Sequence, residues 1–598
     1  MTPTEIDSLM QLAQSGSMSL EQLMQHADAL KQGGHHQQAM DLYKIWIACT
    51  PSPTRFVALF NWGVMLSDAG DLDGAEMAYR QCVALNAGLL QAKINLGLTL
   101  ERKKNFEEAL QQWADVAHAQ AGPASTDVDL KTMALNHIGR LQEFRHVYDE
   151  AEQALVQSLA LNPKQPDAIQ HWVHLRQKQC KWPVCVALPG IRENDMLAAT
   201  SPLAMLSLHD DPALQWMASR AFVERKFKLQ EERLAPAQRI PHARIRIGYV
   251  SGDLCTHAVG LLMADLIEAH DKTRFEIFAF DFSPEDGTAY RARLKSAFDH
   301  VIDIRQLDDR RAALTIRQME IDVLIDLHGL SSGSRPGIMA LHPAHLQGTY
   351  LGFIGTTAMP WIDFVVTDPF ALPEALTPYF TEEPLYIEGS FIPLHKPEMS
   401  EPQVVRTDVG LPEDAVVLAS FNNIYKYNAD LFAVWMGILK RCDKAVLWLL
   451  DDNPCATAQL QQRALEHGIP LHRLVLAKRC THQEYRQRLR LADIYLDTYP
   501  YNAGSTARDV LDARLPMVTL SGKTFISRMA GSMLHAAGVG ELVTHSHADY
   551  EALVVALAHD PQRIAALKQT LEERSATWHQ APARLIASLE KALLARLP

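Results

Sequence analysis

The sequence predicts a multidomain fold in which an N-terminal all-α solenoid of helical repeats is followed by two α/β lobes. Three observations predict it. The chain has 598 residues, which is more than one hydrophobic core usually supports. The first third of the chain shows a period of about 34 residues, a length typical of helix-pair repeats. From Arg244 onward, short apolar runs alternate with helical segments, as in parallel-sheet proteins.

The repeat period is carried by small residues at corresponding positions. Gly63 and Gly97 are one period apart, and Gly139 follows Gly97 after a longer interval. The additional length fits a loop insertion around residues 122–125, and a weaker first unit covers residues 33–43. The period resembles that of the tetratricopeptide repeat. Small residues let the two helices of a unit approach, and units that cannot bury their apolar faces alone stack into a solenoid.

Two functions are open for this solenoid. Its concave surface could hold a protein partner, which is the favoured interpretation. It could also be a structural spacer or a dimerisation arm, so that the chain would form a homo-oligomer. The predicted division of the chain is an N-terminal helical cap (1–25), helical repeats (26–178), a helical linker (179–240), an N-terminal lobe (241–395) and a C-terminal lobe (396–598). Within the linker, residues 201–227 have helical spacing and predict a helix pair.

The strands of the two lobes are predicted from short apolar runs. The first lobe contains RIRIGYVSGD, FEIFAFDF, HVIDI, IDVLIDLHG and WIDFVVTDP. The second contains AVVLASFNN, AVLWLLDDN, HRLVLAK, ADIYLDTYP and LPMVTLSG. Two such lobes in tandem indicate Rossmann-like domains that face each other across a cleft, with ligands outside the carboxyl ends of the strands. No GxGxxG motif is present, which argues against dinucleotide redox chemistry.

Composition excludes several classes of protein. The net charge of −13 and the pI near 6.0 argue against general nucleic-acid binding. No apolar run reaches the roughly 20 residues needed to span a bilayer, and the N-terminus lacks the pattern of a secretory signal. The eight cysteines are scattered and form no CxxC pair, as expected of reduced thiols. We therefore expect a cytoplasmic protein.

Polar residues at two strand ends of the second lobe could hold a phosphate. Lys426 follows the run AVVLASFNN, and its ammonium could neutralise charge on a leaving diphosphate. Ser505 or Thr506 would cap a helix that begins near Ala507, and a helix N-terminus favours anions. Asp509, in the first turn expected for that helix, could accept hydrogen bonds from ribose hydroxyls. The alternatives are a solvated surface lysine and an aspartate that only complements the helix dipole.

The first lobe offers histidines near its strand ends. His257, four residues after Asp253, could contact a sugar, a phosphate or an acceptor, or could be a capping or structural histidine. Histidines also occur in the Gly-rich stretch from His328 to His345, but their spacing fits no familiar metal site. The acidic run 451–453 is expected to be an ordinary polar loop. No metal site is therefore predicted.

Several motifs, in the same order along the chain, resemble those of the O-GlcNAc transferase family in its bacterial form. They are RIGYVSGDLCTH, FSPEDGTAYR, GLSSGSR, LGFIGTT, FNNIYK, LADIYLDTYPYNAGSTARDVL and LPMVTLSGKTFISRMAGSML. The resemblance covers nearly the whole chain after the first 25 or so residues. It implies tetratricopeptide repeats followed by a catalytic region of the GT-B fold, in which two Rossmann-like lobes face each other. It also implies inverting transfer of a sugar from a UDP-sugar to Ser or Thr of proteins, without a metal or other cofactor.

The resemblance assigns roles in donor binding to several residues of the second lobe. Lys426 matches the lysine that contacts the donor diphosphate, and Ser505 and Thr506 match the pair that binds the phosphates. Asp509 matches the aspartate that binds the ribose. Asn423 stands where animal members have a glutamine in the donor site.

Further positions match residues near the base and the acceptor. Arg488 matches an arginine near the uracil, and Tyr485 stands where animal members have a histidine that stacks on it. His257 matches a histidine that has been considered as the general base. Two positions depart from the animal pattern, because Gly504 and Arg317 each stand in place of a histidine expected near the donor or the acceptor.

Related activities stay open at this point. GlcNAc is the favoured sugar and Ser or Thr the favoured acceptor. Transfer of glucose from UDP-glucose to Asn, and fucosyl transfer of the SPINDLY type from GDP-fucose, use similar catalytic regions. Two further alternatives are a repeat scaffold that has lost catalysis and an enzyme that acts on a small molecule. The expected partners are a nucleotide sugar and protein acceptors engaged by the repeats.

Overall fold

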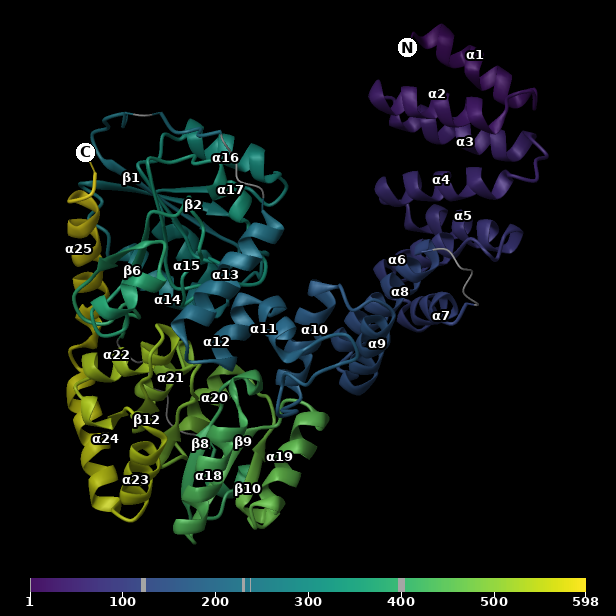
Figure 1. Cartoon of the computed structure of the whole chain (residues 1–598). Coiled ribbons are helices and arrows are strands. Elements are labelled where there is room, and N and C mark those ends of the chain that lie inside the picture. Colours follow the sequence, from purple (N-terminus) through teal and green to yellow (C-terminus); the bar gives the residue numbers. More distant parts are fainter. Residues whose placement is uncertain (1, 120–124, 228–231, 237, 396–403, 598) are drawn as a thin grey trace. The chain divides into compact units, whose positions relative to one another are not determined.

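The computed structural model describes residues 2–119, 125–227, 232–236, 238–395 and 404–597 (Figure 1). The chain divides into two compact units, one formed by Met1–Trp172 with Leu188–Ile191 and the other by Val173–Ala187 with Arg192–Pro598. Within the described residues, no helix is both long and apolar enough to cross a membrane.

Apart from Leu188–Ile191, which forms an isolated β-bridge, the first unit is built from helices that pack mainly against their neighbours in the chain. The pairs α2–α3, α4–α5, α6–α7 and α8–α9 are the stacked repeats (Figure 1). The helices are α1 (Pro3–Gln14), α2 (Leu20–Gln32), α3 (His36–Cys49), α4 (Arg55–Asp68), α5 (Leu72–Leu85), α6 (Leu90–Arg102), α7 (Phe106–Ala117), α8 (Ser125–Phe144), α9 (Tyr148–Leu161) and the start of α10 (Pro166–Lys178).

Glycines of the repeat period lie where two helices of a unit touch. A Cβ atom at Gly63 would lie 2.7 Å from the ring of Tyr79, and one at Gly97 would lie 2.3 Å from Nε1 of Trp113. Each aromatic residue follows its glycine at the same spacing in the sequence, so the same contact recurs in consecutive units. The small residues thus admit the partner helix, which confirms the predicted repeat array.

A group of helices precedes the first lobe. It comprises α11 (Glu193–Ala199), α12 (Pro202–Leu208) and α13 (Pro212–Lys226), so the predicted helix pair over residues 201–227 is confirmed as α12 and α13. Asp210, between them, accepts hydrogen bonds from the Tyr499 hydroxyl at 2.8 Å and the Thr524 hydroxyl at 2.7 Å. This carboxylate fastens the helical group to the second lobe.

The first lobe is a seven-stranded parallel sheet of order β3-β2-β1-β4-β5-β6-β7. Its strands are β1 (Ile245–Ser251), β2 (Phe275–Asp281), β3 (His300–Asp303), β4 (Val323–Asp326), β5 (Leu346–Thr349), β6 (Phe364–Thr367) and β7 (Glu383–Tyr386). Its helices are α14 (Ala258–Glu268), α15 (Ala289–Ala297), α16 (Asp309–Gln318) and α17 (Pro336–Ala340). The five predicted strands are confirmed, and β5 and β7 are additional.

The second lobe is a six-stranded parallel sheet of order β10-β9-β8-β11-β12-β13. Its strands are β8 (Val416–Ser420), β9 (Ala445–Leu450), β10 (Leu474–Ala477), β11 (Ile494–Leu496), β12 (Met517–Leu520) and β13 (Val543–Thr544). Its helices are α18 (Ala429–Arg441), α19 (Pro454–Glu466), α20 (His482–Leu489), α21 (Ser505–Asp512), α22 (Met529–Ala536), α23 (His547–Ala558) and α24 (Pro561–Ser575). Again all five predicted strands are confirmed, and β13 is additional.

The last helix, α25 (Ala581–Leu594), packs against α14 and β7 of the first lobe (Figure 1). The Glu590 carboxylate lies 2.8 Å from Nδ1 of the buried His270, whose Nε2 contacts the Tyr249 hydroxyl at 2.9 Å. The chain therefore returns to the first sheet after completing the second. The chain thus consists of helical repeats followed by two α/β lobes, each with a parallel sheet. This confirms the predicted fold class.

Candidate active site

The site lies at the carboxyl edge of the second sheet, where β8 and β11 are neighbours. Asn422 follows β8 and Asp497 follows β11, and the Asn422 amide lies 3.4 Å from the Asp497 carboxylate. Both side chains are buried. Because parallel strands end at one edge, polar residues that are far apart in the chain meet here.

Lys426 ends the short 3-10 helix Ile424–Lys426 after β8 and is only 8% exposed. Its Nζ donates a hydrogen bond to the carbonyl oxygen of Asn502 at 3.1 Å and lies 4.0 Å from the ring centroid of Tyr501. Burial lowers the pKa of Lys426 to about 8, and the charge of Asp497 partly opposes this shift. The alternative of a solvated surface lysine is therefore wrong.

Asp497 organises the loop between β11 and α21. Its carboxylate accepts hydrogen bonds from the backbone N–H groups of Thr498 and Ala503, both at 2.8 Å, and from the Thr519 hydroxyl at 2.6 Å. Burial raises the pKa of Asp497 to about 6. No role for Asp497 is predicted from the sequence, although a carboxylate directly after a buried strand is a signal for such a residue.

The N-terminus of α21 lies at the end of the same loop. Gly504 occupies the N-cap position with φ −107° and ψ −95°, and no side chain caps the helix. The helix begins at Ser505, so the predicted cap at Ser505 or Thr506 and the start near Ala507 are wrong. Because the first-turn N–H groups of a helix have no intrahelical acceptor, they are available to an anion. The positions of Ser505 and Thr506 agree with such a role.

A cavity of about 340 Å³ lies at the same edge of the sheet, at the ends of β8, β9 and β10, and α20 forms part of its wall. It is lined by Phe421, Leu450, Ala477, Lys478, Arg479, Cys480, His482, Tyr485 and Arg488. The Tyr485 and Phe421 rings lie 6.2 Å apart at 67°. Arg488 donates from Nη1 to the Lys478 carbonyl oxygen at 2.8 Å, and its Nε has no partner among the described residues. Aromatic faces beside a cation suit a flat heterocycle.

The structure brings the predicted ribose and base residues together. The Tyr485 hydroxyl oxygen accepts a hydrogen bond from the Thr506 side chain, which lowers the pKa of Tyr485. Burial has the larger effect and holds this pKa well above its ordinary value. Asp509 lies 3.9 Å from Nε2 of His482, and burial raises its pKa. Asp509 is the fifth residue of α21, so its predicted place in the first turn is wrong. It faces α20 rather than the helix end.

Asn423 lies at the same edge as Lys426 but is exposed. Its side-chain oxygen caps the short 3-10 helix by accepting from the Tyr425 N–H at 3.5 Å. The side chain is therefore fixed by its own turn and faces solvent, where a donor could reach it. Its role in donor binding stays a prediction.

In the first lobe, His257 is the N-cap of α14, with Nδ1 accepting from the Val259 N–H at 3.4 Å. The Asp253 carboxylate lies 3.3 Å from the same Nδ1, and the His257 side chain is 49% exposed. The prediction that His257 is a capping residue is thus confirmed, and the cap involves its Nδ1 and not its Nε2. Buried His328 stands nearby, with its Nε2 accepting from the Gly252 N–H at 2.8 Å.

The other polar positions singled out in the sequence are not brought together. Arg335, the last residue of the motif GLSSGSR, donates to Asp309 at 2.8 Å, and Asn453, in the run 451–453, caps α19 by accepting from the Ala456 N–H at 2.9 Å. Arg317 donates to the Leu234 carbonyl oxygen near the amino end of β4, so its predicted position near the donor or acceptor is wrong. In the part of the chain that the structure describes, no three His, Cys, Asp or Glu side chains are grouped to hold a metal.

Several known proteins are similar in sequence to part of this chain. A probable UDP-N-acetylglucosamine–peptide N-acetylglucosaminyltransferase, SEC of Arabidopsis thaliana, is 33% identical over 337 residues, which cover 55% of this chain and 34% of that protein. The Caenorhabditis elegans UDP-N-acetylglucosamine–peptide N-acetylglucosaminyltransferase is 26% identical, covering 54% and 38%. The Arabidopsis protein named SPINDLY is 29% identical, covering 56% and 37%. The matches thus span little more than a third of these relatives.

A mutant O-GlcNAc transferase of Thermobaculum terrenum has a similar solved structure, with a TM-score of 0.63 and 23% identity. The match covers 100% of this chain and 98% of that one, and it shows that the two share a fold. The sequence pattern of glycosyl transferase family 41 matches residues 223–401 and 396–580, which include both sheets and the loops between β8 and α21. The chain belongs to glycosyl transferase family 41.

Proposed function

We propose that this protein is an inverting, metal-independent glycosyltransferase that moves a sugar, with GlcNAc favoured, from a UDP-sugar to Ser or Thr of proteins. The observation that carries the proposal is the buried ammonium of Lys426, held 3.1 Å from the loop that leads into α21. This fixed cation and the uncapped helix N-terminus lie on one sheet edge, where a diphosphate would meet both. The names of the relatives support the donor and the acceptor class.

The donor would lie along this edge from the base to the sugar. Tyr485 and Arg488 would hold the uracil in the 340 Å³ cavity, and Asp509 would accept hydrogen bonds from the ribose. Ser505 and Thr506 would contact the phosphates at the start of α21. Asn423 and Lys426 would then lie on the β8 side of the diphosphate.

The reaction would be a single displacement at the anomeric carbon. The acceptor oxygen forms a bond to that carbon while the bond to the diphosphate oxygen breaks, and the configuration inverts. The electron pair of the broken bond leaves on the diphosphate, where Lys426 and the helix N-terminus stabilise it. The acceptor hydroxyl must lose its proton, and Nε2 of His257 is the candidate acceptor in the tautomer whose Nδ1–H donates to the Asp253 carboxylate, 3.3 Å away, instead of capping α14.

A donor panel tests this function and separates the alternatives. The purified chain is incubated with UDP-GlcNAc, UDP-glucose and GDP-fucose, with peptides bearing Ser, Thr or Asn as the only acceptor, and released nucleotide and peptide mass are measured. Transfer of GlcNAc to Ser or Thr is expected. Glucosylated Asn or fucosylated Ser would replace the proposed activity with one of its alternatives. If no donor is turned over, the remaining alternative is a repeat scaffold that has lost catalysis.

The pKa of Lys426 predicts how activity depends on pH. With a pKa of about 8, Lys426 in the free enzyme is charged below pH 8 and loses its proton above it. We therefore expect kcat/KM to fall as the pH rises through 8, because this parameter reports the ionisation of the free enzyme. In the variant Asp497→Asn the fall should begin at lower pH, since the carboxylate that raises the pKa of Lys426 is lost. An unchanged pH profile in this variant would contradict the coupling.

Removing divalent metal should leave activity in place. Lys426 and the helix N-terminus supply the positive charge that a metal would otherwise bring to the diphosphate. Turnover after dialysis against EDTA should therefore stay close to the untreated rate. A margin of about twofold allows for the change in ionic strength, which affects exposed charges only weakly. Recovery of activity only after Mg²⁺ or Mn²⁺ is added back would contradict the proposal.

The repeats would engage the protein acceptors, which is the favoured use of their concave surface. The cytoplasmic location and a possible homo-oligomer stay predictions.

A further inference from the structure

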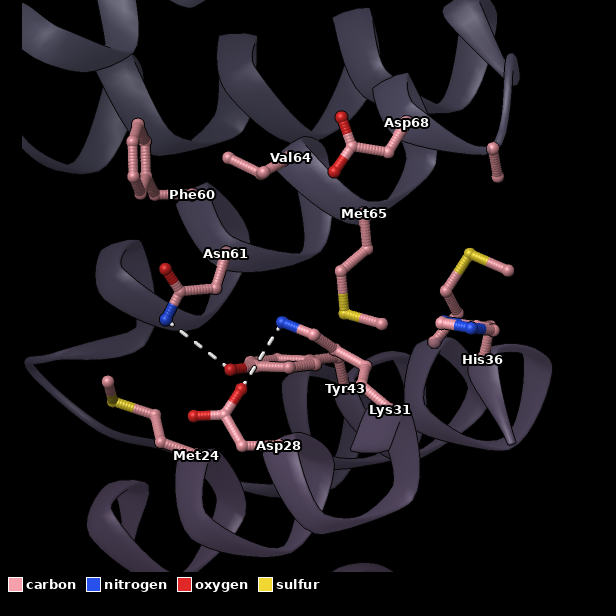
Figure 2. A pocket seen from close by; sticks show the side chains of 12 residues that line it. Met24, Asp28, Lys31, His36, Tyr43, Phe60, Asn61, Val64, Met65 and Asp68 are labelled. Atoms are coloured by element: carbon pink, nitrogen blue, oxygen red, sulfur yellow. Dashed lines mark hydrogen bonds and ion pairs between the residues drawn. The ribbon is translucent and has the colours of Figure 1, made fainter. Parts of the chain in front are cut away.

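A second cavity, of about 620 Å³, lies within the helical repeats between α2, α3 and α4 (Figure 2). Three methionines line it, with Met24 on α2, Met40 on α3 and Met65 on α4. Phe60 and Val64 extend the apolar wall along α4. Methionine side chains are flexible and polarizable, so a cavity built from them adapts to apolar side chains of different shapes.

The polar groups of this cavity are mostly satisfied by one another. Lys31 pairs with Asp28 at 3.2 Å, and the Asn61 amide donates to the Tyr43 hydroxyl at 3.3 Å (Figure 2). Asp68 is different, because no hydrogen bond or ion pair joins its carboxylate to another described residue. Figure 2 shows Asp68 beside Val64 and Met65, on the α4 side of the cavity.

The surroundings of the cavity are acidic. Residues 1–70 contain six aspartates or glutamates and three lysines or arginines. The lysine in the cavity wall, Lys31, is already paired with Asp28, so Asp68 contributes an uncompensated negative charge. A partner that brings a positive charge next to an apolar side chain complements both features, and complementary charge steers its encounter.

We propose that this cavity docks a segment of another protein in which a large apolar side chain stands next to a lysine or arginine. The apolar side chain would enter between Met24 and Met65, and the cation would pair with Asp68. The inference does not depend on glycosyl transfer, because the docked protein need not be the acceptor.

The test uses the full-length protein and three fluorescein-labelled peptides of equal length in a Gly-Ser frame. The first carries Leu-Trp flanked by two arginines on each side. In the second the arginines are replaced by glutamates, and in the third Leu-Trp is replaced by Ser-Ser. Fluorescence anisotropy measures binding without any nucleotide sugar, so a failure here is distinct from a failure of the proposed catalytic function.

Two variants locate the binding on the cavity, each with a matched control elsewhere in the repeats. Asp68→Lys reverses the unpaired charge, and Asp7→Lys makes the same change at an exposed position of α1. Met24→Ser removes apolar surface at a side chain that is 38% exposed, and Met77→Ser does so at one that is 46% exposed. Because all four positions are at the surface, the fold should persist, which circular dichroism checks.

We expect the first peptide to bind, with the other two at least about tenfold weaker. Asp68→Lys and Met24→Ser should each weaken binding about fivefold or more, while the controls stay within about twofold of wild type. The proposal is overturned if the first peptide does not bind, if the glutamate peptide binds as well, or if either cavity variant behaves like its control.

Discussion

Replacing Lys426 by methionine is expected to lower kcat about 10²- to 10³-fold, the loss typical of a single charge-stabilising donor in an active site. Lys426 is buried, and its ammonium is fixed by the Asn502 carbonyl oxygen and the Tyr501 ring. Methionine keeps most of the length of the side chain but removes the charge that would meet the leaving diphosphate. Initial rates at saturating donor measure the effect.

The matched control is Lys444→Met, which removes an exposed lysine just before β9, at the opposite edge of the same sheet. This variant should turn over at the wild-type rate. Thermal unfolding of both variants shows whether the fold is kept. If Lys426→Met is folded and retains wild-type kcat, the lysine does not stabilise the leaving group and the mechanism fails.

Trp113→Ala should lower the free energy of unfolding of the helical repeats by about 3–5 kcal/mol, as for other buried aromatic residues. The indole is completely buried, its Nε1 donates to the Ile94 carbonyl oxygen at 3.2 Å, and the His137 ring stacks on it at 5.1 Å. The substitution therefore leaves a cavity and removes a hydrogen-bond donor from that carbonyl. Because repeats depend on contacts with their neighbours, the loss should spread to the adjacent units.

Hydrogen exchange resolved along the chain measures this effect, since a single melting temperature would mix the two units. Peptides from α6 to α9 should lose protection, while those from the two sheets should not. Met77→Ala, at an exposed position of α5, is the control and should leave exchange unchanged. If the peptides from α6 to α9 keep wild-type protection in the Trp113→Ala variant, the packing described for Gly97 and Trp113 is contradicted.

The fold could be predicted from the sequence where local patterns carry it. The apolar runs of β1, β2, β8 and β9 indicate their strands, and Gly63 and Gly97 indicate the repeat. The strands that were missed lack such a run. β5 reads LQGT, β7 reads EPLY, and β13 has two residues, so each owes its place to the neighbouring strands rather than to its own composition.

The site could be predicted only in part, because its contacts join distant segments. Lys426 and the loop that leads into α21 could be placed at strand ends from the sequence, although the exact start of the helix could not. The pairing of Lys426 with Asn502, which is distant in the chain, follows from the adjacency of β8 and β11, which no local pattern shows. The same holds for Asp497, whose hydrogen-bond partners come from its own loop and from β12.

Binding of UDP, measured by calorimetry, tests most directly the claim that a UDP-sugar lies along the carboxyl edge of β8 to β11. The wild-type chain should bind one UDP and should bind GDP more weakly. Tyr485→Ala should weaken UDP binding about tenfold or more, since stacking on a base contributes about 1–3 kcal/mol. Lys426→Met should also weaken it, through the diphosphate. If UDP does not bind, or if both variants bind it as well as the wild-type chain does, the donor site is not where we propose it.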